Sequence, residues 1–134
     1  MKVDHFAIEV SDLAAAIRFY TEKLGLKLMF SEVDQIQHEA YAFLELEGGN
    51  LELLQGLTED NQPKIYERPV LKPPYCPHLA LQTDDIDSIL ALTKARGIPL
   101  VKGPLEIPGK VKWLYLSDPD NHVIEFVEWE NPSV

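Results

Sequence analysis

Four residues of metal-binding type recur at matched spacing along the chain. Glu52 follows His5 and Glu125 follows His78, each at a separation of 47 positions (5 to 52, 78 to 125). The second pair lies 73 positions after the first (5 to 78, 52 to 125). Two imidazoles and two carboxylates suit a divalent ion such as Zn²⁺, Ni²⁺, Co²⁺, Mn²⁺ or Fe²⁺. The spacing therefore indicates a metal site built from two related parts of the chain.

The neighbours of the two glutamates predict where their side chains point. Glu52 and Glu125 each lie between two large apolar residues in a strand-like stretch. Successive residues of a strand face opposite sides, so each glutamate points away from the core that its neighbours fill. A carboxylate in a partly dry cleft is costly unless it is paired or binds a metal ion. Ala7 and Ala80 follow the histidines on the same face and would leave room for the ion.

The elements that must position these residues repeat as well. HFAIEVSDLAAAIRFYTEKLGLKL begins at His5, and HLALQTDDIDSILALTKARGIPLV begins at His78. Each starts with an alternating stretch that predicts a strand. Ser11 or Asp12 in the first stretch, and Asp84 or Asp85 in the second, can then cap a helix, which stops at a glycine. Two similar modules usually pair about a pseudo-twofold axis, so we expect the two His–Glu pairs to converge at one point.

The predicted fold class is α+β, with two βαβββ modules. The first module has a strand over 3–10, a helix over 12–24, and strands in LKLMFSEV, AYAFLEL and NLELLQ. The second has strands in HLALQT, IPLV, VKWLYLS and HVIEFVEW, with a helix over IDSILALTKAR. In the turn DPDN, Asn121 suits a left-handed backbone conformation. We expect one domain over 1–134, with modules over 1–56 and 78–130 and a connector over 57–77.

The connector contains five prolines and reads as an irregular loop. Long loops of this kind often cover a functional site. We interpret its Tyr75 and Cys76 as structural residues. Arg68 and Lys72 could meet an anionic substrate, although solvated charge is the simpler interpretation.

Composition excludes several classes of partner. The 134 residues carry a net charge of −10, which argues against nucleic acid and anionic membranes, because phosphate groups are bound by clustered lysine and arginine. Cys76 is the only cysteine, so no intrachain disulfide can form, which suits a reducing cytoplasm. No apolar run approaches the ~20 residues of a membrane span, and no signal peptide is evident. We expect a cytoplasmic protein.

Three stretches resemble a known family. DHFAIEVSDLAAAIRFYTEKLGL, PHLALQTDDID and YLSDPDNHVIEF are similar to the vicinal oxygen chelate superfamily, which includes glyoxalase I. The resemblance implies two modules that form an incomplete barrel around a metal cleft. It also implies that His5, Glu52, His78 and Glu125 occupy the four ligand positions, and that the protein is a homodimer.

The resemblance implies a specific chemistry, in which a Lewis-acidic metal stabilises the enolate formed when a proton leaves a carbon next to a carbonyl. A ligand glutamate could take that proton and return it to the neighbouring carbon. Glu125 is our first candidate for this base and Glu52 the second. The substrate would be a small carbonyl compound or a thioester.

One position departs from the pattern of glutathione-dependent glyoxalase I. That enzyme typically has an arginine four residues after the first-strand ligand, where it contacts a glutathione carboxylate. This chain has Glu9 there, on the same strand face as His5, and an acid would repel that carboxylate. We therefore expect Glu9 to face the substrate, and glutathione not to be part of it.

Other members of the superfamily provide alternative functions. Methylmalonyl-CoA epimerases share the metal set, bleomycin-resistance proteins bind a ligand without catalysis, and dioxygenases use a related metal site. The leading hypothesis is a metal-dependent lyase or isomerase of the glyoxalase I type.

Overall fold

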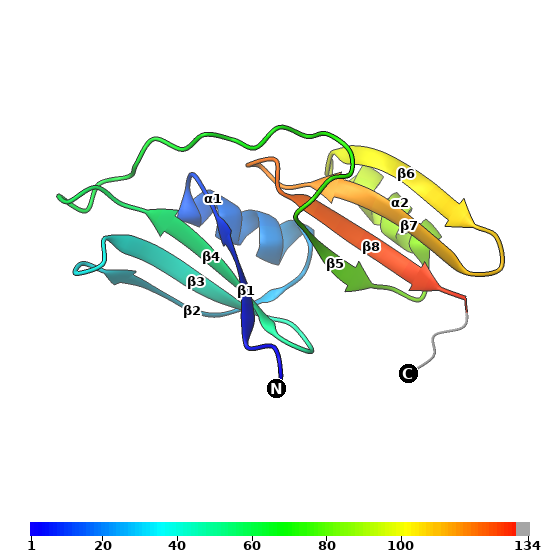
Figure 1. Cartoon of the computed structure of the whole chain (residues 1–134), viewed down its shortest axis with the longest axis horizontal. Helices are drawn as coiled ribbons and strands as arrows, with labels where there is room; N and C mark the ends of the chain where they lie inside the picture. The colour runs from blue at the N-terminus through cyan, green and yellow to red at the C-terminus, as the bar shows by residue number, and fades with distance from the viewer. Residues whose placement is uncertain (131–134) are drawn as a thin grey trace. The chain divides into compact units, whose positions relative to one another are not determined.

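The computed structural model describes residues 1–130, and the last four residues of the expected domain, 131–134, lie outside the described residues. The chain divides into two compact units, Met1–Arg68 and Pro69–Val134. The expected connector is therefore shared between them. Each unit holds one four-stranded sheet with helical segments against it (Figure 1). Within residues 1–130, no helix is long and apolar enough to cross a membrane.

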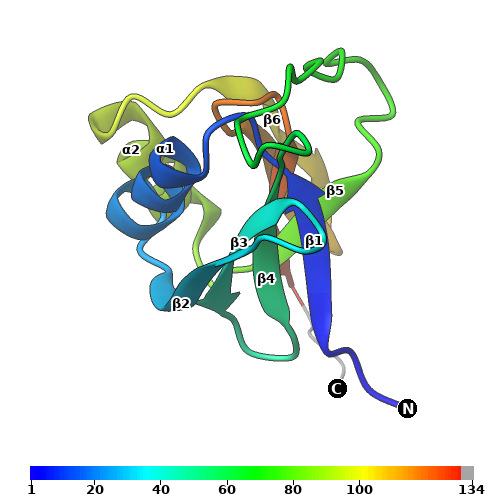
Figure 2. The ribbon, with the colours of Figure 1, turned by 90° about the vertical axis from the view of Figure 1, so that its left-hand side faces the viewer.

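The first unit has the sheet order β1-β4-β3-β2. β1 runs parallel to β4, while β4, β3 and β2 pair antiparallel. Figure 2 shows α1 on one side of this sheet. The elements are β1 (His5–Glu9), α1 (Leu13–Arg18), the π-helical segment η1 (Phe19–Lys23), β2 (Lys27–Asp34), β3 (Glu39–Glu45) and β4 (Asn50–Gly56).

The second unit repeats this topology, with the sheet order β5-β8-β7-β6. β5 runs parallel to β8, and the other neighbours pair antiparallel. The elements are β5 (His78–Gln82), α2 (Ile86–Ala95), β6 (Leu100–Ile107), β7 (Val111–Ser117) and β8 (Val123–Trp129). The predicted α+β class and the two βαβββ modules are thus confirmed. Each sheet is open, and neither closes on itself.

The first predicted helix is not one regular α-helix. It changes to a π-helix at Phe19, where the N–H of Leu24 donates to the Phe19 carbonyl at 3.2 Å. The hydroxyl of Thr21 also donates to the Ile17 carbonyl at 2.7 Å. A hydroxyl bonded back to the preceding turn competes with the regular ladder and disturbs it. The residues predicted to be helical are helical, but their winding is wider at the C-terminal end.

β6 is twice the length of the strand predicted from IPLV. The predicted strand ends before Lys-Gly-Pro, yet the observed strand continues through Gly103 with shifts in its pairing to β7. Gly103 has φ +107, and a Cβ there would lie 3.1 Å from the Leu114 Cα. Only glycine allows this backbone conformation and this close approach, so the strand bulges here rather than ending.

Both helices are fixed to their sheets by equivalent contacts. Asp12 accepts a hydrogen bond from the Ala15 N–H at 3.1 Å, and Asp85 accepts one from the Ser88 N–H at 3.2 Å. These caps confirm the predicted helix starts. The first helical N–H of each helix is bound by a strand side chain: Leu13 donates to Gln55 at 2.9 Å, and Ile86 donates to Glu128 at 2.8 Å. Gln55 and Glu128 are also 73 positions apart, so the repeat extends to these contacts.

The helix-facing side of each sheet forms the core. In the first unit, Gln55 reaches the helix from the same strand face as the buried leucines of β4. Burying these side chains is the main favourable contribution to folding. The opposite face of each sheet is only partly covered. The residues of the core that are fully buried include Leu44, Leu51 and Leu53 in the first unit and Leu114, Leu116 and Ile124 in the second.

Candidate functional site

Each predicted His–Glu pair lies on the sheet face that points away from the helix. In β4, Glu52 lies between the buried Leu51 and Leu53 and therefore points to the opposite side. Strand pairing places Ala7 on one side of Glu52 and Phe43 on the other. The second unit repeats this row, because Glu125 pairs with Ala80 of β5 and Tyr115 of β7. The predicted orientation of both glutamates is confirmed.

In the first unit, His5 and Glu52 lie close together. The Nε2 atom of His5 is 3.5 Å from the Oε1 atom of Glu52, whose side chain is 15% exposed. The other ring nitrogen, Nδ1, lies 2.6 Å from the Asp4 carboxylate. The imidazole is thus placed between two carboxylates, one at each nitrogen.

In the second unit, His78 and Glu125 form the equivalent pair. The Nε2 atom of His78 is 2.9 Å from the Oε1 atom of Glu125, and both side chains are largely buried, at 21% and 15% exposed. The Nδ1 atom of His78 lies 2.9 Å from the backbone carbonyl oxygen of Tyr75. The Cys76 thiol lies 3.9 Å from the same nitrogen. Both histidines therefore present Nε2 to a glutamate and Nδ1 to an acceptor.

These contacts fix which ring nitrogen carries the proton. A carbonyl or carboxylate oxygen only accepts, so Nδ1 of His5 and of His78 must donate. In the neutral ring, the lone pair then lies on Nε2, the atom that faces the glutamate. Nε2 of His78 and the Glu125 carboxylate, 2.9 Å apart, are both groups of the kind that bind divalent ions. An acceptor at the distal nitrogen is also the usual support of a metal-binding histidine. Each pair therefore offers one nitrogen and one carboxylate of metal-binding type.

Aromatic rings flank both imidazoles in the same way. The ring of His5 contacts Phe43 edge to face, with centroids 5.2 Å apart at 72°. The ring of His78 contacts Tyr115 with centroids 5.6 Å apart at 67°. In the second unit, Tyr75 also lies against Tyr115, at 5.1 Å. These rings limit the orientation of each imidazole and shield one side of it from water.

The backbone at Tyr75 adopts an unusual conformation for a bulky residue. Its φ is +61°, in the left-handed region that disfavours large side chains. In this conformation its carbonyl accepts from His78 while its ring packs on Tyr115. Strain of this kind persists when the surrounding contacts require it and is concentrated at functional sites. Asn121 is also left-handed, with φ +65°, as its position in DPDN predicted.

Glu9 ends β1 and is exposed, on the same face as His5. It pairs in register with Leu54, two residues before Gly56. Its Oε2 atom and the side chain of Lys64 both lie over Gly56, at 3.9 Å and 3.5 Å from the position that a Cβ would take there. An acidic group therefore stands on the His5 side of the sheet, with a lysine close by. That Glu9 contacts substrate remains a prediction.

The two pairs are brought together within their units, but their convergence at one point remains a prediction. Among residues 1–130, no group of three or more His, Cys, Asp or Glu side chains is arranged to hold a metal ion within either unit. Each unit instead supplies one histidine and one glutamate.

The groups that support the histidines are harder to find from the sequence. Asp4 carries a signal, because it is a carboxylate directly before a candidate ligand. Tyr75 was interpreted as structural, and its role depends on a backbone carbonyl that residue type does not reveal. Phe43 and Tyr115 could have been found from their positions opposite Glu52 and Glu125 in adjacent strands.

Tyr41, on the same face of the first sheet as Glu52, has a shifted pKa. The hydroxyl of Tyr41 in β3 donates to Glu32 in β2 at 3.1 Å. This hydrogen bond to Glu32, followed by desolvation and the charge of Glu32, raises the pKa of Tyr41 above its ordinary value. Tyr41 is therefore a neutral donor that is already engaged with a carboxylate.

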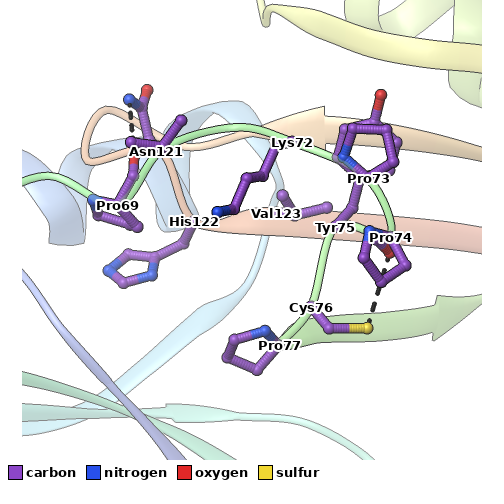
Figure 3. Close-up of a pocket in the computed structure, with 11 residues that line it drawn as sticks. Pro69, Lys72, Pro73, Pro74, Tyr75, Cys76, Pro77, Asn121, His122 and Val123 are labelled. Atoms are coloured by element: carbon purple, nitrogen blue, oxygen red, sulfur yellow. Dashed lines mark hydrogen bonds between the residues drawn. The ribbon is translucent and has the colours of Figure 1, made fainter.

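A separate pocket lies in the second unit, between the proline-rich connector and the turn before β8 (Figure 3). Its volume is about 220 Å³, and Lys72 and His122 are among the residues that line it. The Asn121 amide donates to the Pro69 carbonyl at 3.2 Å across its edge. None of the four predicted ligands lines this pocket. It is a feature of the connector, distinct from the His78–Glu125 pair.

Comparisons with known proteins show which proteins this chain is similar to. The chain is 30% identical over 137 residues to "Uncharacterized protein YwbC" of Bacillus subtilis (strain 168), covering 95% of this chain and 97% of that protein. It is 28% identical over 130 residues to the lactoylglutathione lyase of Haemophilus influenzae, covering 96% and 93%. These relatives match along nearly their whole length.

Structural comparison gives a further relative of a different kind. The fold resembles that of TnmS3, an antibiotic binding protein from Streptomyces sp. CB03234, with a TM-score of 0.71 and 25% identity over 97% of each chain. The family model described as "Glyoxalase/Bleomycin resistance protein/Dioxygenase superfamily" matches residues 2–126. Since this match spans both units with their repeated His–Glu pairs, the chain belongs to the glyoxalase/bleomycin resistance protein/dioxygenase superfamily.

Proposed function

We propose that this protein is a divalent-metal-dependent lyase or isomerase of the glyoxalase I type, which transfers a proton next to a carbonyl group. The observation that carries the proposal is the repeated pair. His5 with Glu52 and His78 with Glu125 each present an imidazole Nε2 beside a carboxylate, with Nδ1 held by an acceptor. The similarity to a lactoylglutathione lyase supports the reaction class.

His5, Glu52, His78 and Glu125 would hold the ion. When bound, a divalent ion supplies positive charge beside the carbonyl oxygen and lowers the cost of removing the neighbouring proton. Asp4 and the Tyr75 carbonyl keep the two Nε2 atoms in the binding tautomer. Zn²⁺, Ni²⁺ and Co²⁺ suit this mixed nitrogen and oxygen set best, with Mn²⁺ and Fe²⁺ as further options.

Glu125 is our first candidate for the base, and Glu52 is the second. The carboxylate of Glu125 would take a proton from the carbon next to the substrate carbonyl and return it to the adjacent carbon. Its position on the open face of the second sheet, with Tyr115 beside it, supports this assignment. The substrate is a small carbonyl compound or a thioester, and the acidic Glu9 disfavours a glutathione adduct. We further propose a cytoplasmic homodimer.

Metal content and solvent exchange test the proposal together. We expect the purified protein to bind about one divalent ion for each set of two His–Glu pairs. We also expect that solvent deuterium enters a 2-oxo aldehyde substrate only when this ion is bound. Glu125→Gln should lower turnover by about 10²- to 10⁴-fold, the usual contribution of a general base. Glu128→Gln is the matched control, because it changes the same strand on the opposite face and keeps an acceptor for the Ile86 N–H.

Two results would contradict this function. The first is that the wild-type protein binds no divalent metal, and that its metal content is the same as that of Glu125→Ala. The second is a metal-loaded protein in which Glu125→Gln and Glu52→Gln both retain full exchange activity. Glutamine keeps the size of the side chain but cannot accept the proton as a carboxylate does.

The similarity to an antibiotic binding protein favours a second candidate, a protein that binds a small molecule without catalysis. In that case ligand affinity would be independent of metal, and no deuterium would enter the ligand. An epimerase would exchange deuterium into 2-methyl thioesters, and a dioxygenase would consume oxygen with catechols. The same panel of substrates therefore separates these functions.

A further inference from the structure

Three aromatic side chains form a cluster on the open face of the first sheet. The rings of Phe30 in β2 and Phe43 in β3 stack with centroids 5.1 Å apart at 26°. Tyr41 lies edge to face against both, at 6.3 Å from Phe30 and 6.1 Å from Phe43. Such distances are those of favourable ring contacts. We call Phe30, Tyr41 and Phe43 the aromatic cluster.

The aromatic cluster adjoins the His5–Glu52 pair. Phe43 is the residue paired with Glu52 across β3 and β4, and its ring touches that of His5 at 5.2 Å. Phe30 pairs with Phe43 in the next strand, so the rings continue the same row. A group that extends from a carbonyl held at His5 and Glu52 would therefore pass over the aromatic cluster.

The aromatic cluster is not needed to fill the core. The core side of β3 is already closed by Ala42 and Leu44, which are 0% exposed. Phe30, on the other face, remains 43% exposed. A stacked pair of large rings that is exposed at Phe30 and half-buried at Phe43 forgoes part of the free energy that burial would provide. A ligand that covers these rings would recover it.

The charge around the aromatic cluster selects among ligands. Glu32, Glu52 and Glu9 all lie on this face of the sheet. The cation that the same strands contribute, Lys27, is at the far end and lies 4.0 Å from Glu45. Lys64, from the connector, lies beside Glu9 over Gly56, which leaves Glu32 and Glu52 as the acids next to the rings. Tyr41 is a donor, but its hydroxyl already binds Glu32. An anionic ligand would be repelled here, whereas a cation would be attracted to both the rings and the carboxylates.

We propose that the substrate carries a planar aromatic ring, uncharged or positively charged, which packs on Phe30 and Phe43 while its carbonyl lies beside His5 and Glu52. This inference rests on the proposed function for the position of the carbonyl. It names the substrate as an aryl carbonyl compound. Aliphatic or carboxylate-bearing compounds would bind more weakly at the same place.

Four ketones that differ in shape and charge test the inference by titration of the full chain, followed by NMR. Acetophenone and cyclohexyl methyl ketone compare a flat ring with a puckered one. 4-Acetylbenzoate and 4-acetyl-N,N,N-trimethylanilinium compare a negative with a positive charge. We expect the two aryl ketones without negative charge to bind about three- to tenfold more tightly than the cyclohexyl ketone, and 4-acetylbenzoate to bind most weakly. The shifted resonances should fall in β2 and β3.

Variants of the aromatic cluster provide the control. Phe30→Leu and Phe43→Leu should abolish the preference for the aryl ring, while Phe30→Trp should keep it. Val33→Ala should change nothing, because Val33 is an exposed apolar residue of β2 that pairs with Ala40 on the opposite face. If a leucine variant does not fold, the affinities of the four ketones for the wild-type protein and the positions of the shifted resonances still test the inference.

Several results would overturn the inference: equal affinity for aryl and cyclohexyl ketones, tightest binding of 4-acetylbenzoate, or an aryl preference that persists in Phe30→Leu. Failure of the proposed function looks different. An aryl preference that depends on Phe30, without metal-dependent exchange of any aryl glyoxal, would support the aromatic ligand and contradict the proposed reaction. Metal-dependent turnover without an aryl preference would support the proposed reaction and contradict the aromatic ligand.

Discussion

The Nδ1 atom of His78 donates to the backbone carbonyl of Tyr75 at 2.9 Å, and Tyr75 holds that carbonyl in place with a φ of +61°. The contact depends on the backbone and not on the tyrosine side chain. Asparagine tolerates the left-handed conformation, whereas the β-branched valine does not. We therefore expect Tyr75→Asn to keep metal affinity close to that of the wild type. Tyr75→Val should weaken it about 10- to 100-fold, as loss of a supporting contact does.

Isothermal titration with Zn²⁺ measures these affinities, and ¹⁵N NMR of the imidazole reports which nitrogen of His78 carries the proton. Both variants lose the ring contact with Tyr115, so a difference between them isolates the carbonyl. Equal metal affinities in the two variants would show that the carbonyl does not support His78.

Asp4 supports His5 in the same way, but with a smaller expected effect. Its carboxylate lies 2.6 Å from Nδ1 of His5 and is 92% exposed. Exposed ion pairs contribute little, because water competes for both partners. We expect Asp4→Ala to weaken metal binding by less than about tenfold and Asp4→Asn, which keeps an acceptor oxygen, to weaken it less. A loss in Asp4→Ala as large as that in Tyr75→Val would contradict this ranking.

The strand faces on which Glu52 and Glu125 lie could be read from the sequence because the relevant signals are local. Alternation in NLELLQ and VIEFVE placed Glu52 and Glu125 opposite the core, and the structure agrees. Helix starts at Asp12 and Asp85 followed from capping chemistry, which involves only the next few residues. Local rules succeed where an element's own residues determine its conformation.

Features that depend on contacts between distant residues could not be predicted in this way. The strand β6 continues through Gly103, beyond the predicted stretch IPLV, because it pairs with β7. The hydrogen bond from the Ile86 N–H to Glu128 joins residues 42 positions apart. The carbonyl of Tyr75 supports His78 through a backbone angle that the residue type disfavours.

Tyr41 should titrate above the usual range of tyrosine because it donates to Glu32. A raised pKa means that the neutral phenol persists to higher pH. Any stability from this contact is therefore present below the pKa of the unfolded chain and is lost as pH rises through the folded pKa. Glu32→Gln removes the charge and should lower the pKa of Tyr41. Ultraviolet titration of the phenolate measures both values, with Tyr41→Phe identifying the signal. An unchanged titration in Glu32→Gln would contradict the assignment.

Gly103 is required in β6 for two separate reasons, and each can be measured. Its φ is +107°, and a Cβ would lie 3.1 Å from the backbone of Leu114. Gly109 has φ +76° but nothing within 4 Å of its Cβ position. We expect Gly109→Ala to cost about 1 kcal/mol of unfolding free energy, and Gly103→Ala to cost more, because strain and a backbone clash combine. Urea unfolding compares the two variants. Equal losses would mean that the approach to Leu114 relaxes without cost.

Glu9 provides the last prediction, which concerns the choice of substrate. It lies on the His5 face at the end of β1, at the position where the resemblance to glyoxalase I implies an arginine that contacts a glutathione carboxylate. We expect the wild-type protein to turn over the glutathione adduct of methylglyoxal poorly. Glu9→Arg should raise kcat/KM for this adduct by roughly tenfold, since an exposed charge-assisted contact yields only part of its full strength.

The control for Glu9→Arg is an aryl glyoxal without glutathione, whose turnover should not rise with the added positive charge. Glu9→Gln separates the removal of repulsion from the gain of a new contact, and should give a smaller increase than Glu9→Arg. If the wild type turns over the glutathione adduct as fast as the aryl glyoxal, Glu9 does not exclude glutathione. In that case the nearby Lys64, whose side chain lies over Gly56 with Glu9, would be the group to test next as the partner of the glutathione carboxylate.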